Sequence, residues 1–112
     1  MNALGIDFGT KNIGVAISIS GIIQPLTMLK NNQEIFISLQ KIITEYQLEK
    51  IYVGLSDGKI AELTKKFIDL LKTQITLPVE TVEETATTIE AQGYHQNIDA
   101  VSAAIILRRC LS

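Results

Sequence analysis

One acid inside an apolar segment near the amino terminus is the residue whose type and setting best suit chemistry. Asp7 lies in the segment Leu4–Gly9, where bulky apolar residues alternate with glycines and this single carboxylate. In a strand, that alternation gives one apolar face and one face that carries the carboxylate between residues without side chains. Because the backbone there can be approached closely, the segment suits a metal ion or a phosphate held beside the sheet.

Two other interpretations of this segment stay open from the motif alone. In the first, it is an ordinary hairpin, in which Gly9 and Gly14 supply unusual backbone angles and Asp7 accepts hydrogen bonds from local amides. In the second, Asp7 belongs to a phosphate loop, because the Gly-x-Asp-x-Gly-Thr pattern resembles that of actin and Hsp70-like ATPases as well as the first metal acid of ribonuclease H-like nucleases. The rest of the chain has to decide between them.

Length and composition favour one globular domain covering residues 1–112. The mass of 12.3 kDa leaves no room for the two lobes of an actin-type nucleotide clamp. Apolar residues make up 46% of the chain, charged residues make up 20%, and no stretch has the composition of a linker. The single cysteine, Cys110, excludes an internal disulfide and is expected to be a small buried residue on the last helix. The sequence begins directly with a strand pattern, so we expect a cytoplasmic protein.

The overall charge sets a limit on nucleic-acid binding. The net charge is −2 and the isoelectric point is near 5.3, whereas phosphate contacts usually supply most of the affinity for nucleic acid. Local clustering of cations would be needed, and the candidates are Lys11, Lys30, Lys59, Lys65, Lys66, Arg108 and Arg109. We therefore expect any such binding to be weak and salt-sensitive.

The elements that must position Asp7 begin with three short strands. After the strand around Asp7, alternating apolar patterns predict strands at about 13–19 and 22–29, with Pro25 favouring an edge position. Three strands joined by short turns imply an antiparallel meander. Apolar spacing and turn signals in the rest of the chain predict a helix at 33–47, a buried parallel strand at 51–55, a helix from about 60 that ends before Pro78, a strand at 79–83, and helical segments at 85–92 and 98–111.

This order of elements predicts an α/β fold. Three antiparallel strands followed by two strand–helix units make one five-stranded mixed sheet with helices on both faces, which is the architecture of the ribonuclease H-like fold.

Within that architecture, several acids fall at one edge of the sheet. Asp7 is on the first strand, Glu83 and Glu84 end the fifth, and Asp99 lies in the first turn of the last helix. Sites in α/β sheets form outside the carboxyl ends of the strands, so three carboxylates are expected to converge there. Their mutual repulsion calls for cations, and oxygen ligands favour Mg²⁺ or Mn²⁺.

Two questions about these acids stay open from the sequence. Adjacent strand residues point to opposite faces, so either Glu83 or Glu84 is the companion of Asp7. The glutamates and Asp99 also have a simpler explanation, since acids at the start of a helix interact favourably with its dipole.

The combined motifs resemble one family over nearly the whole chain. Members of the YqgF (RuvX) family, known as Holliday junction resolvases and as pre-16S rRNA nucleases, carry similar motifs in the same order. Here those motifs are Gly5–Lys11 with Ile13–Ala16, the Gln24–Leu26 step, Val53–Leu55, Glu83–Thr88 and Ile98–Leu107. The resemblance implies a ribonuclease H-like fold and metal-dependent phosphodiester cleavage, with Asp7, Glu84 and Asp99 matching the three family acids.

The same resemblance implies a mechanism and a set of partners. Asp7, Glu84 and Asp99 would hold two Mg²⁺ or Mn²⁺ ions, Lys11 would contact a phosphate, and Thr87 and Thr88 would donate hydrogen bonds near the site. The implied substrate is precursor 16S rRNA, cleaved at its 5′ end, with branched DNA as the alternative. The protein would act on nucleic acid or ribosomal particles, as a monomer or a homodimer.

Departures from the family pattern favour a further alternative. Asn12 and Thr85 stand where the family usually has arginines that could hold phosphate, and the loop at 56–59 is shorter than usual. These changes are expected to weaken the binding of substrate more than the binding of metal. The alternative is therefore a catalytically weak relative that binds nucleic acid or a ribosomal partner through the same face.

Overall fold

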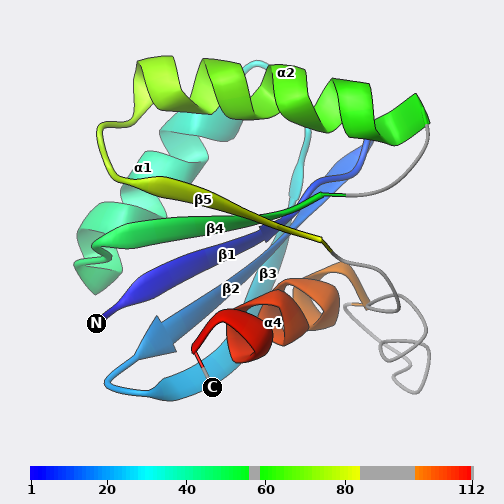
Figure 1. Ribbon diagram of the computed structural model, residues 1–112. Coiled ribbons are helices and arrows are strands. Elements are labelled where there is room, and N and C mark those ends of the chain that lie inside the picture. The colour runs from blue at the N-terminus through cyan, green and yellow to red at the C-terminus, as the bar shows by residue number, and fades with distance from the viewer. Residues whose placement is uncertain (56–58, 84–97, 112) are drawn as a thin grey trace.

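Five strands form one mixed sheet in the order β3-β2-β1-β4-β5 (Figure 1). The protein is described here by a computed structural model, which covers residues 1–55, 59–83 and 98–111. The strands are β1 (Ala3–Asp7), β2 (Asn12–Ile19), β3 (Ile22–Lys30), β4 (Lys50–Leu55) and β5 (Val79–Glu83). The five predicted strands are therefore confirmed, and the predicted helical segment at 85–92 lies outside the described residues.

The strand directions follow the predicted pattern of a meander and two parallel additions. β1 pairs antiparallel with β2, and β2 pairs antiparallel with β3. On its other side β1 pairs parallel with β4, and β4 pairs parallel with β5. Pro25 lies on the edge strand β3, opposite Ala16, where the ladder is irregular. An edge position tolerates proline because it has no backbone N–H to donate.

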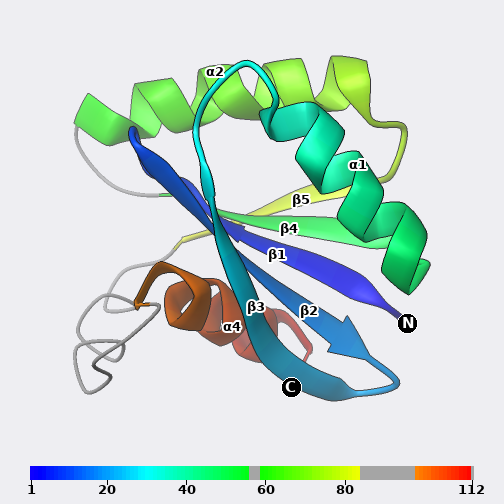
Figure 2. The same ribbon diagram turned by 180° about the vertical axis from the view of Figure 1, so that it is seen from behind.

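Helices cover both faces of the sheet. Figures 1 and 2 show α1 (Ile35–Tyr46) and α2 (Lys59–Gln74) over one face and α4 (Ile98–Leu111) over the other. In α1, Ile35, Leu39 and Ile43 are buried at four-residue spacing, which is the apolar stripe of an amphipathic helix. None of the described helices is long and apolar enough to cross a membrane.

The alternation of side chains along β1 divides the core into two parts. Leu4 and Ile6 belong to the larger cluster, which lies between the sheet and the pair α1 and α2. Ala3 belongs to the smaller cluster under α4, which also contains Ala103 and Leu107. Small residues on this face of the sheet let α4 lie close to the central strand.

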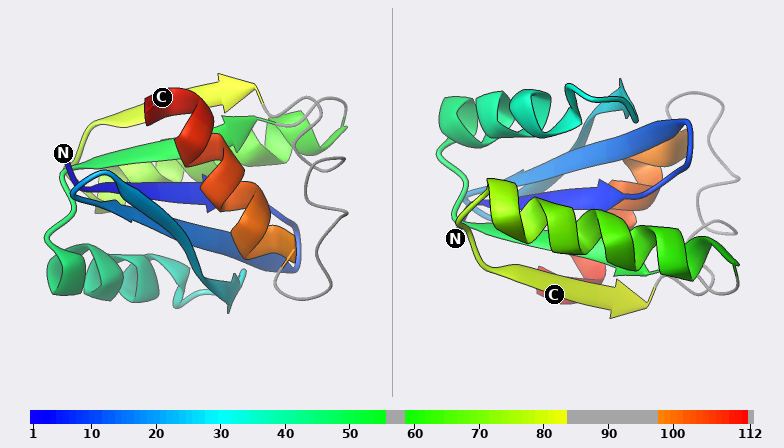
Figure 3. Two further views of the ribbon diagram at one scale, coloured as in Figure 1. Left: turned by 90° about the horizontal axis from the view of Figure 1, so that it is seen from below. Right: turned by 90° about the horizontal axis from the view of Figure 1, so that it is seen from above.

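The parallel strands end together at one edge of the sheet. β1, β4 and β5 run in the same direction, and α4 begins at the edge where they end and runs back across the sheet (Figures 1 and 3). We call this the carboxyl edge. It is the place where the predicted acids were expected to meet.

Candidate active site

Asp7 is the last residue of β1, the central strand of the sheet. It follows Ala3 and Gly5 in the two-residue period, so it shares the face that α4 covers. Its neighbours across the sheet are Gly14 in β2 and Gly54 in β4. Cross-strand neighbours point to the same face, so no side chain occupies the positions on either side of the half-buried carboxylate.

Gly5 and Gly9, which precede and follow Asp7 in the sequence, have a different role from the predicted one. A methyl group added at Gly5 would lie 2.6 Å from Cγ of Leu107 and 2.8 Å from the carbonyl oxygen of Ala103. Close approach at Gly5 therefore serves the packing of α4, whereas the ion or phosphate expected at Asp7 stays a prediction. At Gly9, in the loop after β1, an added methyl group would collide with the backbone carbonyl oxygen of Asn12, the first residue of β2. The neighbouring strands carry Gly14 and Gly54 beside Asp7, and both of these glycines are buried.

The loop that follows Asp7 is tied to the end of β3. Asn31 donates a hydrogen bond from Nδ2 to the carbonyl oxygen of Gly9 at 3.0 Å. The backbone N–H of Asn31 donates to the carbonyl oxygen of Lys11 at 2.8 Å. These two bonds fix the backbone on both sides of Thr10, and they leave the Lys11 side chain exposed near the carboxyl edge.

The fifth strand brings one predicted acid to the same edge. Glu83 is the last residue of β5 and pairs with Leu55. Val82 pairs with Gly54, and Gly54 pairs with Asp7, so Val82 and Asp7 are in line across the sheet. Val82 also packs against the cluster under α4. Glu84, Thr87 and Thr88 lie outside the described residues, so their predicted roles stay predictions.

The last helix carries the third predicted acid. Asp99 is the second residue of α4, which begins at the carboxyl edge on the face that Asp7 shares (Figure 3). The backbone thus brings Asp7 and the start of α4 to one edge, as predicted. Among the residues that the structure describes, no group of three or more acids, histidines or cysteines is close enough to hold a metal, and Glu84 is not one of those residues.

An ion pair and a cation–π contact lie at the other end of the strands. Lys50, at the start of β4, has its Nζ 3.8 Å from Oε1 of Glu80 and 4.8 Å from the ring centroid of Tyr52. The hydrogen bond with Tyr52 raises the pKa of Lys50, and the charge of Glu80 adds to this. Burial raises the pKa of the Cys110 thiol. Cys110 is half-buried against the cluster under α4, close to its predicted setting.

Sequence reasoning missed the features that depend on register. Nothing in the sequence indicates that Gly14 and Gly54 stand opposite Asp7, because strand pairing is set by the whole sheet. The hydrogen bond from Asn31 to the carbonyl oxygen of Gly9 was also not predicted from the sequence. Its only signal was the polar pair Asn31–Asn32 directly after an edge strand.

Comparison with known proteins gives one family for the full chain. A family model described as "RuvX: Holliday junction resolvase" matches residues 1–112. Three relatives share the name "Putative pre-16S rRNA nuclease". The protein of Thermoanaerobacter pseudethanolicus is 38% identical over 133 residues, which cover 99% of this chain and 96% of the relative. The protein of Pseudomonas putida is 35% identical, covering 94% and 90%. The protein of Sulfurihydrogenibium sp. is 30% identical, covering 96% and 88%.

Solved structures with the same fold are far more distant in sequence. T. thermophilus RuvC in complex with a Holliday junction substrate aligns with a TM-score of 0.67 at 14% identity, covering 98% of this chain and 92% of that one. The fowlpox virus Holliday junction resolvase aligns with a TM-score of 0.58 at 15% identity, covering 98% and 97%. These likenesses confirm the predicted fold, a five-stranded mixed sheet with helices.

Proposed function

The chain belongs to the RuvX family, and we propose that it is a divalent-metal-dependent nuclease that hydrolyses phosphodiester bonds at the 5′ end of precursor 16S rRNA. The observation that carries the proposal is the position of Asp7. It ends the central strand, stands between Gly14 and Gly54, and shares its face with α4. Three relatives that match nearly the whole chain are named for this RNA.

We propose Asp7, Glu84 and Asp99 as the residues that would hold the metal. Carboxylate oxygens are hard ligands, which Mg²⁺ and Mn²⁺ prefer. Gly14 and Gly54 support this assignment, because the strand positions on either side of Asp7 carry no side chain that would compete with a bound ion. Two such ions, when bound, would lower the pKa of the attacking water and stabilise the leaving oxygen.

The register of β5 favours Glu84 over Glu83 as the companion of Asp7. Val82 is in line with Asp7 across the sheet and packs on the α4 side. Glu83 is one residue later and pairs with Leu55, which packs in the cluster on the opposite face. The two-residue period of a strand therefore puts position 83 out of phase with Asp7.

Lys11 is the proposed contact to a substrate phosphate. It is exposed in the loop that follows Asp7, and two hydrogen bonds of Asn31 hold that loop. A lysine ammonium group next to a metal site would position a phosphate without reading sequence. We assign Thr87 and Thr88 as hydrogen-bond donors to the same substrate, on the strength of the family resemblance alone.

The decisive experiment compares two Asp→Asn variants in a cleavage assay. Purified wild type, Asp7→Asn and Asp69→Asn would each be incubated with labelled precursor rRNA in Mg²⁺, in Mn²⁺ and in EDTA. Asp69 is exposed on α2 and supplies the matched control. We expect cleavage to require the metal, to persist in Asp69→Asn and to fall to background in Asp7→Asn. Full activity in Asp7→Asn would contradict the proposed site.

Branched DNA is a second candidate substrate, because the family model that matches the whole chain is described as a Holliday junction resolvase. A four-way junction has two-fold symmetry, so its cleavage would favour a homodimer with two facing sites, whereas trimming of RNA needs only a monomer. The same assay with a labelled junction, together with the mass in solution, separates these substrates. Metal-independent binding without cleavage of either would indicate the catalytically weak, binding relative, with Asn12 and Thr85 as its cause.

A further inference from the structure

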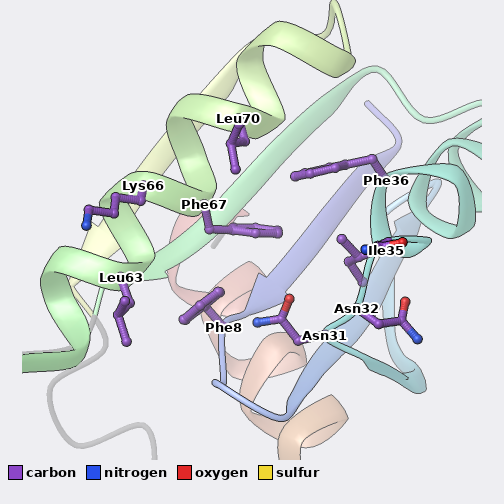
Figure 4. A pocket seen from close by; sticks show the side chains of 10 residues that line it. Phe8, Asn31, Asn32, Ile35, Phe36, Leu63, Lys66, Phe67 and Leu70 are labelled. Atoms are coloured by element: carbon purple, nitrogen blue, oxygen red, sulfur yellow. The ribbon is translucent and has the colours of Figure 1, made fainter.

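A cavity opens on the face of the sheet opposite to α4, beside the carboxyl edge. It lies between the end of β1, the loop before α1 and the helices α1 and α2 (Figure 4). Its volume is about 470 Å³, within the roughly 300–1,000 Å³ of small-molecule sites. Among the residues that the structure describes, neither Asp7 nor Lys11 lines it.

Three phenylalanine rings contribute to the apolar lining of this cavity, together with Ile35, Leu63 and Leu70. Phe67 is only 5% exposed and lies between the other two rings. Its centroid is 5.1 Å from that of Phe8 and 5.5 Å from that of Phe36, with the Phe36 ring tilted by only 18°. Phe8 and Phe36 are half-buried, so part of each ring faces the cavity. Such rings offer flat surfaces on which a planar group can stack.

Polar groups line the same cavity. Asn31 uses Nδ2 to bind the carbonyl oxygen of Gly9, which leaves its Oδ1 as an acceptor. Asn32 uses Oδ1 to accept from the backbone N–H of Glu34, which leaves its Nδ2 as a donor. An apolar helix or peptide side chain docked here would cover these amides without satisfying them, at a cost in free energy.

A lysine also lines the cavity, in addition to the aromatic rings and the two asparagines. Lys66 on α2 lines the cavity rim and is exposed, as is Leu63 one turn earlier, and the Lys66 ammonium group points outward from the rings (Figure 4). Aromatic faces, an amide donor, an amide acceptor and a lysine together match a nucleotide, with its planar base, its hydrogen-bonding edge and its phosphate. They match an acidic or purely apolar partner less well.

The position of Phe8 connects this cavity to the proposed active site. Phe8 directly follows Asp7, and consecutive Cα atoms are about 3.8 Å apart. The two side chains leave the strand end toward opposite faces, since Phe8 packs with the cluster of α1 and α2. A strand of nucleic acid that crosses the carboxyl edge with one phosphate at Asp7 can therefore place a neighbouring base in the cavity.

We infer that the cavity bounded by Phe8, Phe36, Phe67 and Lys66 is a binding site for one unpaired base of a single-stranded nucleic-acid segment next to the cleaved phosphate. This inference rests on the proposed nuclease function. It adds a requirement of its own, because a base enters the cavity only where the strand is unpaired.

A binding assay in EDTA tests the site without any cleavage. The probe is a short single-stranded RNA that carries one 2-aminopurine, whose fluorescence falls when it stacks on an aromatic ring. The chain has no tryptophan, so the probe is excited separately from the protein. We expect quenching by wild type, and about tenfold weaker binding with little quenching by Phe36→Leu, since a stacked base contributes roughly 1–3 kcal/mol.

Matched controls lie next to both tested residues. Ile37→Ala changes an exposed residue beside Phe36 that does not line this cavity, and it should behave as wild type. Lys66→Gln should lower the salt dependence of binding, whereas Lys65→Gln, its exposed neighbour, should not. Thermal unfolding of each variant verifies that it is folded.

The outcomes separate this inference from the proposed function. Absence of quenching by wild type, or undiminished quenching by folded Phe36→Leu, would overturn the base site even if the protein cleaves RNA. Quenching that depends on Phe36 would support the site, even if Mg²⁺ and Mn²⁺ then fail to produce cleavage. That result would contradict the proposed nuclease function and leave the base-binding site supported.

Discussion

Gly5 and Asp7 occupy the same face of β1, but their surroundings give them different roles. Gly5 meets Leu107 and the backbone of Ala103, so its missing side chain sets how closely α4 approaches. Asp7 stands where the strand ends, next to Gly14 and Gly54. One residue thus positions the helix that carries Asp99, and the other supplies a carboxylate to the proposed site.

Gly5→Ala should destabilise the protein by about 1–3 kcal/mol through overpacking. In an uncrowded strand the same change would stabilise slightly, because alanine restricts the unfolded chain. Urea denaturation measures the change in the free energy of unfolding. In a Leu107→Ala background the cost should be smaller, because the Cγ atom that lies 2.6 Å from the added methyl group is gone. A neutral Gly5→Ala variant would contradict this account of the contact.

Cys110 should titrate at higher pH in the folded protein than in the unfolded one. Burial raises the pKa of its thiol, so the folded state holds this proton more tightly than the unfolded state. Its effect on stability is absent below the usual thiol pKa and becomes destabilising as the pH rises through that value. Rates of alkylation by iodoacetamide, measured against pH with and without urea, check this. An equal or lower midpoint in the native protein would refute it.

Elements were predictable here because each depends on local periodicity. Ile35, Leu39 and Ile43 have helical spacing and lie on the buried side of α1, and the predicted strand at 79–83 has the same limits as β5. Pairing between elements was less accessible. That Gly54 lies opposite Asp7 depends on the register of β4 against β1, which packing of the whole sheet determines.

For the candidate site, the sequence predicted more than the structure tests. The structure brings Asp7 and the start of α4, which carries Asp99, to the carboxyl edge as expected. Glu84 lies outside the described residues, so its role as a ligand remains a prediction. The proximity of Phe8 to Phe67 was not predicted, because contacts between a strand end and a helix leave no periodic signal.

Phe67→Ala should lower the free energy of unfolding by about 3–5 kcal/mol, because it empties the space between α2 and the sheet. Phe67 is 5% exposed and contacts the rings of Phe8 and Phe36. Leu70→Ala provides the control on the same helix, because Leu70 is 55% exposed and its loss should cost less than about 1 kcal/mol. Chemical denaturation of both variants gives the comparison. Equal costs would show that α2 does not pack through Phe67.

At the scale of the molecule, the two faces of the sheet divide the proposed tasks. The α4 face carries Asp7 and the start of the helix with Asp99, and the opposite face carries the aromatic cavity. Both open near the carboxyl edge. A substrate that uses both must bend across this edge, which a single strand does far more readily than a duplex.

Overall charge then determines how such a substrate is held. With a net charge of −2, the protein attracts phosphate only through local cations such as Lys11. For single-stranded RNA, each neutralised phosphate contributes about −0.7 to the slope of log affinity against log salt concentration. We expect a shallow slope of about −2, corresponding to roughly three phosphates. Fluorescence anisotropy of a labelled RNA, measured in EDTA over a KCl series, gives this slope.

Single lysine variants locate the cations responsible. Lys11→Gln should make the slope shallower by about 0.7, because it removes one phosphate contact near Asp7. Lys72→Gln removes an exposed lysine from the last turn of α2, at the far end of the sheet, and should leave the slope unchanged. If Lys72→Gln changed the slope as much as Lys11→Gln, RNA would be held by diffuse surface charge. Binding at the carboxyl edge requires the two variants to differ.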